Sequence, residues 1–178
     1  MVSPCNKALN TLPRRGLYSP DLARTPPRPL FMVNTDFIIR TATTAAELQA
    51  CFDLRWQVLR APWQQPRGSE QDDKETNAFH VMALINNTVV GVGRVHRTAN
   101  QQTQIRYMAV LSDFQHCGIG TALLLALETK AREWQAKTIL LNARENARGF
   151  YQLHHYQITG PAPTLFDSID HVKMEKLL

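Results

Sequence analysis

The chain has 178 residues, of which 44% are hydrophobic and 20% are charged, and its formal net charge is +5 at pH 7. This length suits one well-packed domain and is short for two. There is no run of about 18 or more apolar residues and no secretory signal pattern, so we expect a cytoplasmic protein without a membrane partner. The three cysteines are widely spaced and form no Cys-x-x-Cys pair, which argues against a metal site.

The positive charge is concentrated at the start of the chain. Residues 1–31 hold five basic residues and one acidic residue, a net charge of +4, whereas the remaining residues hold 15 basic and 14 acidic residues, a net charge of +1. Six of the ten prolines also precede Met32. We therefore expect a disordered, proline-rich extension over residues 1–34 and one domain over residues 35–178. The extension is interpreted either as an organellar transit peptide or as translated upstream sequence with the start at Met32, and we favour the second interpretation.

The domain begins with a strand signal followed by a helix signal. Phe37 to Ile39 is a short apolar run that contains two β-branched residues, which is typical of a strand. Thr44-Ala45-Ala46-Glu47 matches a capping box, and Pro62 should end the helix that this box opens. Residues 61–78 show no periodicity and are expected to form a loop or an irregular helix.

Three consecutive strands are predicted next. Phe79 to Ile85 and Thr88 to His96 are apolar runs separated by Asn86-Asn87, a dipeptide that tolerates the positive φ angles of a tight turn. These runs predict an antiparallel hairpin. Gln104 to Leu111 is expected to be the third strand.

The rest of the chain alternates between helix and strand signals. Ile119 to Trp134 has apolar residues at helical spacing, with Glu128 and Arg132 expected as an ion pair on the outer side of the helix. Thr138 to Leu141 predicts a buried strand and Asn146 to His154 a short helix. Val172 to Glu175 alternates as a strand does, within an additional strand pair at the end. This order predicts an α/β domain with a mixed sheet and helices on its faces.

The segment between the third strand and the long helix carries the chemistry. It contains Gln115-His116-Cys117-Gly118-Ile119-Gly120 immediately before the apolar helical run. The first N–H groups of a helix lack an intrahelical partner and lie at its positive end, so a phosphate is the expected ligand. Gly118 and Gly120 would let the backbone approach a pyrophosphate closely. A Rossmann loop would need a glycine at Leu123, and the chain lacks the Gly-Lys-Ser/Thr of a Walker loop.

This pattern resembles the acetyl-CoA motif of the GNAT superfamily of N-acetyltransferases, Arg/Gln-x-x-Gly-x-Gly/Ala after the fourth strand. Residues 104–134 are similar to the region that carries the motif. Residues 146–156 are similar to a later helix of the family, in which a Phe-Tyr or Leu-Tyr pair precedes a Gly-Phe turn. Here His155 stands where the family usually has Gly, and Tyr156 where it has Phe. The order of strands from about residue 36 to residue 178 also resembles the family.

The resemblance implies an α/β fold with a GNAT-like mixed, mostly antiparallel central sheet of six or seven strands, flanked by about four helices. It implies a cofactor cleft where the fourth and fifth strands splay apart. Acetyl-CoA would be the cofactor, and its pantetheine arm would pair with the backbone of Met108 and Val110. The residues implied to bind it are Met108, Ala109, Val110, Gln115, His116, Cys117, Gly118, Ile119, Gly120, Thr121, Asn146 and Tyr151.

The implied reaction is direct attack of a primary amine, on a small molecule or a peptide, on the acetyl thioester in a ternary complex. An N–H group near Val110 would stabilise the developing oxyanion, and Tyr151 would protonate or hydrogen-bond the departing thiolate. A lysine-like amine is neutral in only about one molecule in a thousand at pH 7, so a base should help. His80 is our first candidate for this base, and the other candidates are His96, Glu70, Asp72, Asp73 and Glu75.

Several alternatives stay open on the sequence alone. A non-catalytic acyl-CoA-binding regulatory module would keep the same loop without turnover. Cys117 lies at a helix start beside His116, which would suit a cysteine hydrolase, although neighbours on a tight turn rarely converge as nucleophile and base. The basic extension lacks interleaved aromatic residues, so no specific nucleic-acid partner is expected. The resemblance leaves open a homodimer paired through sheet edges.

Overall fold

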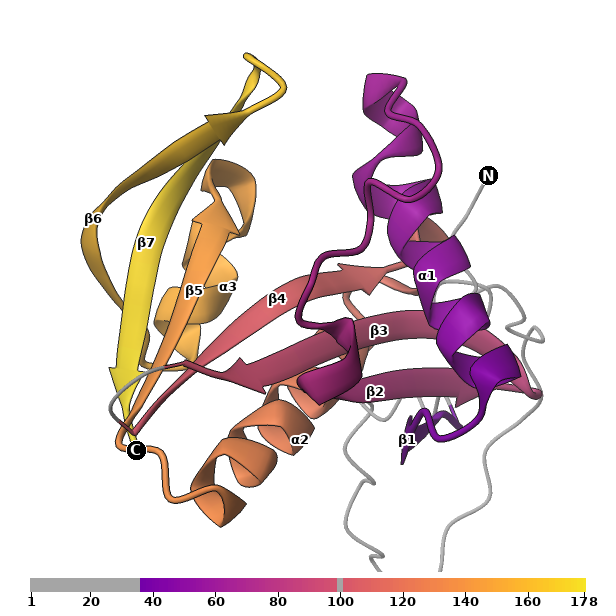
Figure 1. Ribbon diagram of the computed structural model, residues 1–178, viewed down its shortest axis with the longest axis horizontal. Helices are drawn as coiled ribbons and strands as arrows, with labels where there is room; N and C mark the ends of the chain where they lie inside the picture. Colours follow the sequence, from indigo (N-terminus) through magenta and orange to yellow (C-terminus); the bar gives the residue numbers. More distant parts are fainter. Residues whose placement is uncertain (1–35, 99–100) are drawn as a thin grey trace, which may run out of the picture.

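The computed structural model describes residues 36–98 and 101–178, and the predicted extension over residues 1–34 lies outside this part (Figure 1). The described chain forms one seven-stranded sheet in the order β1-β2-β3-β4-β5-β7-β6 with three α-helices. The pairing of β4 with β5 is parallel, and the other five pairings are antiparallel. The predicted α/β class and mixed sheet are confirmed, with three α-helices in place of about four.

The strands are β1 (Ile38–Thr41), β2 (Ala78–Ile85), β3 (Thr88–Arg97), β4 (Gln102–Val110), β5 (Thr138–Arg144), β6 (Gln157–Leu165) and β7 (Ile169–Leu177). The α-helices are α1 (Ala45–Leu59), α2 (Ile119–Glu133) and α3 (Arg148–Leu153), and the 3-10 turns are η2 (Ala61–Trp63), η3 (Glu75–Asn77), η4 (Ser112–Phe114) and η5 (Glu145–Ala147). The predicted order of elements is confirmed. Strand β4 starts at Gln102, two residues before the predicted start at Gln104. The short helix predicted from Asn146 is divided into η5 and α3.

Helix α1 begins at the predicted capping box. The Thr44 side chain accepts a hydrogen bond from Glu47 N–H at 3.2 Å, and Glu47 Oε2 accepts one from Thr44 N–H at 3.0 Å. Cys51 and Leu54 are buried on the face that packs against the sheet, in a core cluster that includes Val92 of β3. Helix α1 therefore covers one face of the sheet next to β3 and β4.

Helix α2 packs on the opposite face, where the larger core lies. Leu123, Leu124 and Leu127 are fully buried there. A Cβ atom at Gly93 of β3 would lie 2.8 Å from Leu127 Cδ1, so the helix can approach β3 this closely only over a glycine. The predicted ion pair of Glu128 with Arg132 is confirmed at 3.4 Å, but Glu128 is 1% exposed and also pairs with Lys176 of β7 at 2.8 Å, which corrects its predicted outer position.

Strands β4 and β5 pair over only a short distance and then diverge (Figure 1). Their parallel register joins Gln102–Gln104 to Thr138–Leu140. Further along β4, Tyr107 has φ 56° and the register with β3 shifts, which together define a bulge within the strand. The end of β4 therefore has a strand neighbour on the β3 side only, as expected for a splayed pair.

Two negative observations apply to the described residues. No helix among residues 36–98 and 101–178 is long and apolar enough to cross a membrane. Within the same ranges, no three His, Cys, Asp or Glu side chains lie close enough together to hold a metal ion.

Candidate active site

The loop that was predicted to bind a pyrophosphate leads directly into α2. Gly118 is the N-cap residue and has a left-handed backbone with φ 83°, a conformation that favours glycine. No side chain of the described residues caps the helix. The first hydrogen bond of the helix runs from Ala122 N–H to Gly118 O at 3.0 Å. The N–H groups of residues 119–121 therefore have no partner within the helix and form a site suited to an anion.

The side chains around this loop leave its backbone accessible. Ile119 is 1% exposed and packs in the core, so only its backbone can face a ligand. A Cβ atom at Gly120 would contact the Phe150 ring at 3.5 Å, which shows how closely α3 approaches the start of α2. Thr121 Oγ1 lies 3.1 Å from His154 Nε2 at the end of α3. The first turn of α2 and α3 therefore lie in direct contact.

The last residues of β4 present backbone groups to the open side of the strand. Leu111 N–H donates to Val90 O of β3 at 2.9 Å. Because backbone groups alternate in direction along a strand, Val110 N–H and C=O point away from β3, toward the side where β5 has diverged. Gln115 Nε2 donates to Val110 O at 3.2 Å, which ties the loop to this strand end. Ala109 is buried against α1, and its backbone pairs with Val92 of β3.

Tyr151 of α3 faces the same strand end. Its side chain is 8% exposed, and its hydroxyl donates to Met108 Sδ at 3.7 Å. Burial raises the pKa of Tyr151 to about 12. The hydroxyl therefore keeps its proton at neutral pH beside β4 and can act as a proton donor.

The turn after α3 explains an unusual residue in the predicted motif. His155 has φ 68°, a left-handed conformation, so glycine would be the unstrained residue at this position. Tyr156 is 2% exposed and contacts the Tyr151 ring edge-on, with 5.8 Å between ring centroids. The turn thus forms without the expected glycine and keeps Tyr151 facing β4.

All the predicted cofactor residues except Asn146 fall into two groups. Met108, Ala109, Val110 and Tyr151 meet at the divergence of β4 and β5, whereas residues 115–121 form the loop before α2. His116 is exposed in that loop with φ 61°, and Asn146 is exposed in η5, directly after β5. The two groups are joined at Gln115, whose side chain donates to Val110 O.

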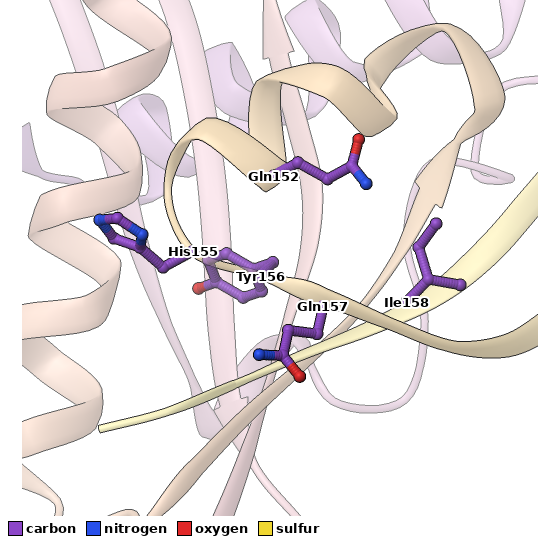
Figure 2. Close-up of a pocket in the computed structure, with 5 residues that line it drawn as sticks. All are labelled: Gln152, His155, Tyr156, Gln157 and Ile158. Atoms are coloured by element: carbon purple, nitrogen blue, oxygen red, sulfur yellow. The ribbon is translucent and has the colours of Figure 1, made fainter.

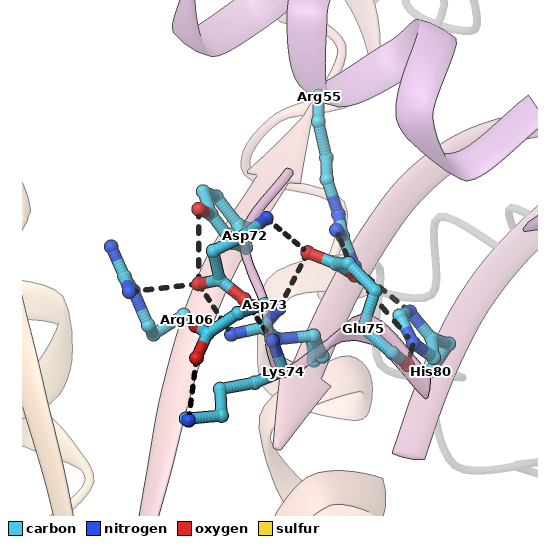
Figure 3. A network of polar contacts seen from close by, with 9 residues as sticks. Arg55, Asp72, Asp73, Lys74, Glu75, His80 and Arg106 are labelled. Carbon is cyan, nitrogen blue, oxygen red and sulfur yellow. Dashed lines mark hydrogen bonds and ion pairs between the residues drawn. The ribbon is translucent and has the colours of Figure 1, made fainter. Parts of the chain in front are cut away.

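On the α1 side of β4, charged side chains form a network of polar contacts (Figure 3). Tyr107 lies among them, because the guanidinium groups of Arg55, Arg94 and Arg106 contact its ring and its hydroxyl donates to Asp72. Arg94 is fully buried and binds Asp72 through two hydrogen bonds of 2.6 and 2.9 Å. Glu75 pairs with Arg55 at 2.9 Å and with Arg94 at 2.5 Å. Sequence reasoning missed Arg55, Arg94 and Tyr107 as site residues. One signal in the sequence could have indicated Arg94: it is a charged residue between Gly93 and Val95, in a strand otherwise rich in apolar, β-branched residues.

His80, the predicted base, belongs to this network. Arg55 Nη2 lies 3.0 Å from His80 Nδ1, and because a guanidinium can only donate, Nδ1 accepts this hydrogen bond. Nε2 therefore carries the ring proton and donates to Glu75 O at 2.9 Å. Burial lowers the pKa of His80, which keeps the ring neutral. Both ring nitrogens are thus engaged within the protein.

The other candidate bases are also engaged or lie elsewhere. Asp73 pairs with Lys74 at the surface, and the buried Glu70 accepts hydrogen bonds from Gly68 N–H and the Gln71 side chain. His96 lines a separate pocket whose other lining residues are Lys74, Asn77, Arg97 and Trp134. A further pocket lies where α3 turns into β6 and is lined by Gln152, His155, Tyr156, Gln157 and Ile158 (Figure 2). It does not include the strand end at Met108 and Val110.

The comparison with family models assigns the class of protein. The model of the acetyltransferase (GNAT) family matches residues 48–156, which include β2 to β5, α2 and α3. The chain therefore belongs to the GNAT family of acetyltransferases. The predicted resemblance is confirmed, and with it the expectation of an enzyme of this family.

Relatives and solved structures agree with this assignment. The uncharacterized N-acetyltransferase YjcF of Bacillus subtilis is 27% identical over 135 residues, which cover 76% of this chain and 96% of the relative. An acyl-CoA N-acyltransferase from Pseudomonas aeruginosa superposes with a TM-score of 0.67 at 21% identity, covering 79% of this chain and 98% of that chain. A GNAT family acetyltransferase from Elizabethkingia anophelis with acetyl-CoA bound has a TM-score of 0.65 at 20% identity, covering 80% and 99%. The two structures are similar in fold.

Proposed function

We propose that this protein transfers the acetyl group of acetyl-CoA to a primary amine, on a small molecule or a peptide, by direct attack in a ternary complex. The observation that carries the proposal is the protonated Tyr151 hydroxyl beside Met108, where β4 and β5 have diverged. The acetyl-CoA bound to the Elizabethkingia anophelis structure supports this compound as the donor.

The residues present fit the donor. The start of α2 offers backbone N–H groups without a side-chain cap, and the left-handed Gly118 exposes the backbone. At the other end, Val110 points its backbone groups into the space that β5 leaves open. We propose that the donor is held by Met108, Ala109, Val110, Gln115, His116, Cys117, Gly118, Ile119, Gly120, Thr121, Asn146 and Tyr151.

When bound, acetyl-CoA supplies a thioester carbonyl as the electrophile and a thiolate as the leaving group. Val110 N–H is oriented to donate to an oxygen that gains negative charge, and a fixed backbone donor needs no reorganisation. Tyr151 holds a proton on its hydroxyl oxygen and can pass it to the departing sulfur. The two groups come from different elements, β4 and α3, so their separation depends on the packing of α3.

We infer that His80 positions Arg55 and does not accept the amine proton. Protonation of Nδ1 would replace an accepted hydrogen bond from Arg55 by a repulsion between two buried cations. Asp72 and Glu75 are held in ion pairs with the arginines, so both carboxylates are engaged within the protein as well. The amine then reacts from its small neutral fraction, and its proton passes to solvent.

Initial-rate kinetics test the proposed reaction. With acetyl-CoA and a panel of primary amines, we expect thiol release together with an acetylated amine identified by mass spectrometry. Double-reciprocal plots at several amine concentrations should intersect, because both substrates must be bound before transfer. Parallel plots would indicate a covalent acyl-enzyme and contradict direct attack. If acetyl-CoA binds but its thiol is not released in the presence of any amine tested, the non-catalytic module would be favoured.

A further inference from the structure

Two arginines from different parts of the fold meet at one carbonyl oxygen. Arg60, the C-cap residue of α1, donates from Nη1 to Leu59 O at 3.0 Å. Arg144, the last residue of β5, donates from Nη2 to the same oxygen at 3.4 Å. These contacts bring the end of α1 against the end of β5, across the divergence of β4 and β5. Two guanidinium groups thus share one neutral acceptor.

The charges of this arginine pair are not neutralised by an ion pair. Arg60 is 8% exposed, and its Nε donates to another carbonyl, Ser69 O, at 2.8 Å. Within residues 36–98 and 101–178, no carboxylate lies within ion-pair distance of Arg60 or Arg144. Glu70 acts on Arg60 only from beyond that distance. Burial lowers the pKa of both guanidinium groups, as expected for cations without a counterion.

Aromatic rings hold the arginine pair in place. The Arg60 guanidinium carbon lies 5.6 Å from the centroid of the Tyr107 ring and 5.4 Å from that of Phe166, in the turn between β6 and β7. The Arg144 guanidinium carbon lies 4.4 Å from the centroid of the Trp63 ring. Stacking on aromatic faces orients a guanidinium without neutralising its charge. The arrangement is therefore fixed in position while the positive charges stay unneutralised.

The arginine pair lies close to the proposed reaction site. Tyr107, which contacts Arg60, directly precedes Met108, the residue that contacts the Tyr151 hydroxyl. Tyr107 contacts the α1 side of the sheet, whereas Met108 packs near Gly93 and Leu127 on the α2 side. The pair thus lies across β4 from Tyr151, on the side opposite the proposed proton donor. An acceptor there could reach the end of β4 without crossing α2.

We propose that Arg60 and Arg144 bind an oxyanion group, a carboxylate or a phosphate, on the amine acceptor, so that the preferred acceptor is an amine that carries a negative charge. This inference rests on the proposed function and specifies its substrate class. Guanidinium groups match carboxylate and phosphate oxygens with paired hydrogen bonds. An anion would also supply the charge that the two cations lack. A polyamine or another purely cationic acceptor would be repelled.

Matched acceptors test the proposal through kcat/KM. Each pair should share the amine and differ in the anion, such as an amino acid against its carboxamide and an aminoalkyl phosphate against the amino alcohol. We expect the wild type to prefer the anionic member of at least one pair by tenfold or more. The pair that shows the preference identifies the oxyanion as carboxylate or phosphate. Equal or better use of the neutral member in every pair would overturn the proposal.

Variants locate the preference. Arg144→Gln should lower kcat/KM for the anionic acceptor by about 10- to 100-fold, mainly through KM, because a hydrogen bond to a charged group is lost. It should leave the neutral acceptor nearly unchanged. Arg60→Gln should act in the same direction. The matched control is Arg40→Gln, because Arg40 lies on the edge strand β1, and this variant should keep the preference for the anionic acceptor. Retention of the full preference in both Arg144→Gln and Arg60→Gln would contradict the proposed site.

A measurement without turnover separates this inference from the proposed function. With the donor site filled by saturating coenzyme A, inorganic phosphate should raise the melting temperature of the wild type and of Arg40→Gln but not of Arg144→Gln. Equal shifts in all three proteins would overturn the arginine site, even if acetyl transfer is observed. Failure of acetyl-CoA to bind would contradict the proposed function instead, and the phosphate shift would then be measured without coenzyme A.

Discussion

Replacing Tyr151 by phenylalanine is expected to lower kcat by about 100- to 10,000-fold, the range typical of a lost general acid. The change removes only the hydroxyl that contacts Met108 Sδ, so the core around α3 should stay intact. Because burial raises the pKa of Tyr151 to about 12, the wild type should lose no activity through ionisation of this group up to about pH 10, roughly two pH units below that pKa. KM for acetyl-CoA should change little. Steady-state thiol release measures both constants.

Tyr156→Phe is the matched control for this variant. Tyr156 is also a buried tyrosine and packs against the Tyr151 ring, but it follows α3 and does not contact Met108. Removal of the Tyr156 hydroxyl should leave kcat within about threefold of wild type. Equal kcat values for Tyr151→Phe and wild type would show that the departing thiolate needs no proton from Tyr151.

Arg94→Met is expected to lower the free energy of unfolding by about 3 to 5 kcal/mol, the cost of breaking a buried ion pair from one side. Arg94 is fully buried, and its loss leaves Asp72 and Glu75 with fewer partners while their side chains are only 17% and 13% exposed. Urea denaturation followed by circular dichroism measures the change. A loss below about 1 kcal/mol would show that the network contributes little to stability.

The same variant should change how stability depends on pH. Burial alone would raise the pKa of Asp72, but hydrogen bonds from Arg94 and Lys74 N–H and the charge of Arg106 hold it well below its usual 3.8. A lowered pKa in the folded state stabilises the protein above pH 3.8, and this contribution disappears as the pH falls further. Arg94→Met should therefore show a shallower loss of stability in acid than wild type.

His80→Gln is the control within the same network. Replacement of the neutral His80 removes no charge and only weakens a hydrogen bond of Arg55. The expected decrease in the free energy of unfolding is about 1 to 3 kcal/mol. The pH profile of kcat should keep its wild-type shape, because His80 is proposed to position Arg55. Disappearance of an inflection from that profile would identify His80 as the base after all.

Local sequence signals predicted the elements whose structure is set locally. The Thr44 to Glu47 capping box, the Asn86-Asn87 turn and the helical spacing after Gly118 each depend on residues within a few positions of one another. The element order followed from these signals. The boundaries of the elements differ from the predicted ones by a few residues where pairing with a neighbouring strand determines the end. Strand β5, for example, extends to Arg144 because it pairs with β7.

Features set by distant residues could not be predicted in the same way. Asp72 and Glu75 lie in a segment without periodicity, and their positions follow from arginines about twenty residues away in sequence. Glu128 was expected on the outer side of α2 because Arg132 follows it by one turn; it does pair with Arg132, but it is buried and also pairs with Lys176 of β7. Nothing in the sequence marks Tyr107 as a bulge residue with positive φ. The arginine pair consists of Arg60 and Arg144, which are 84 positions apart in the sequence.

Calorimetric titration of acetyl-CoA into wild type and Gly120→Glu tests the central claim most directly. The new side chain places bulk and negative charge at the start of α2, where the pyrophosphate is proposed to bind, next to Phe150. Thr129→Glu is the matched control, because it adds the same charge to the exposed side of the same helix about 13 Å further along, at 1.5 Å per residue. We predict binding to wild type and to Thr129→Glu, and at least a 100-fold weaker affinity for a folded Gly120→Glu. Equal binding by all three proteins, or none by wild type, would contradict the account.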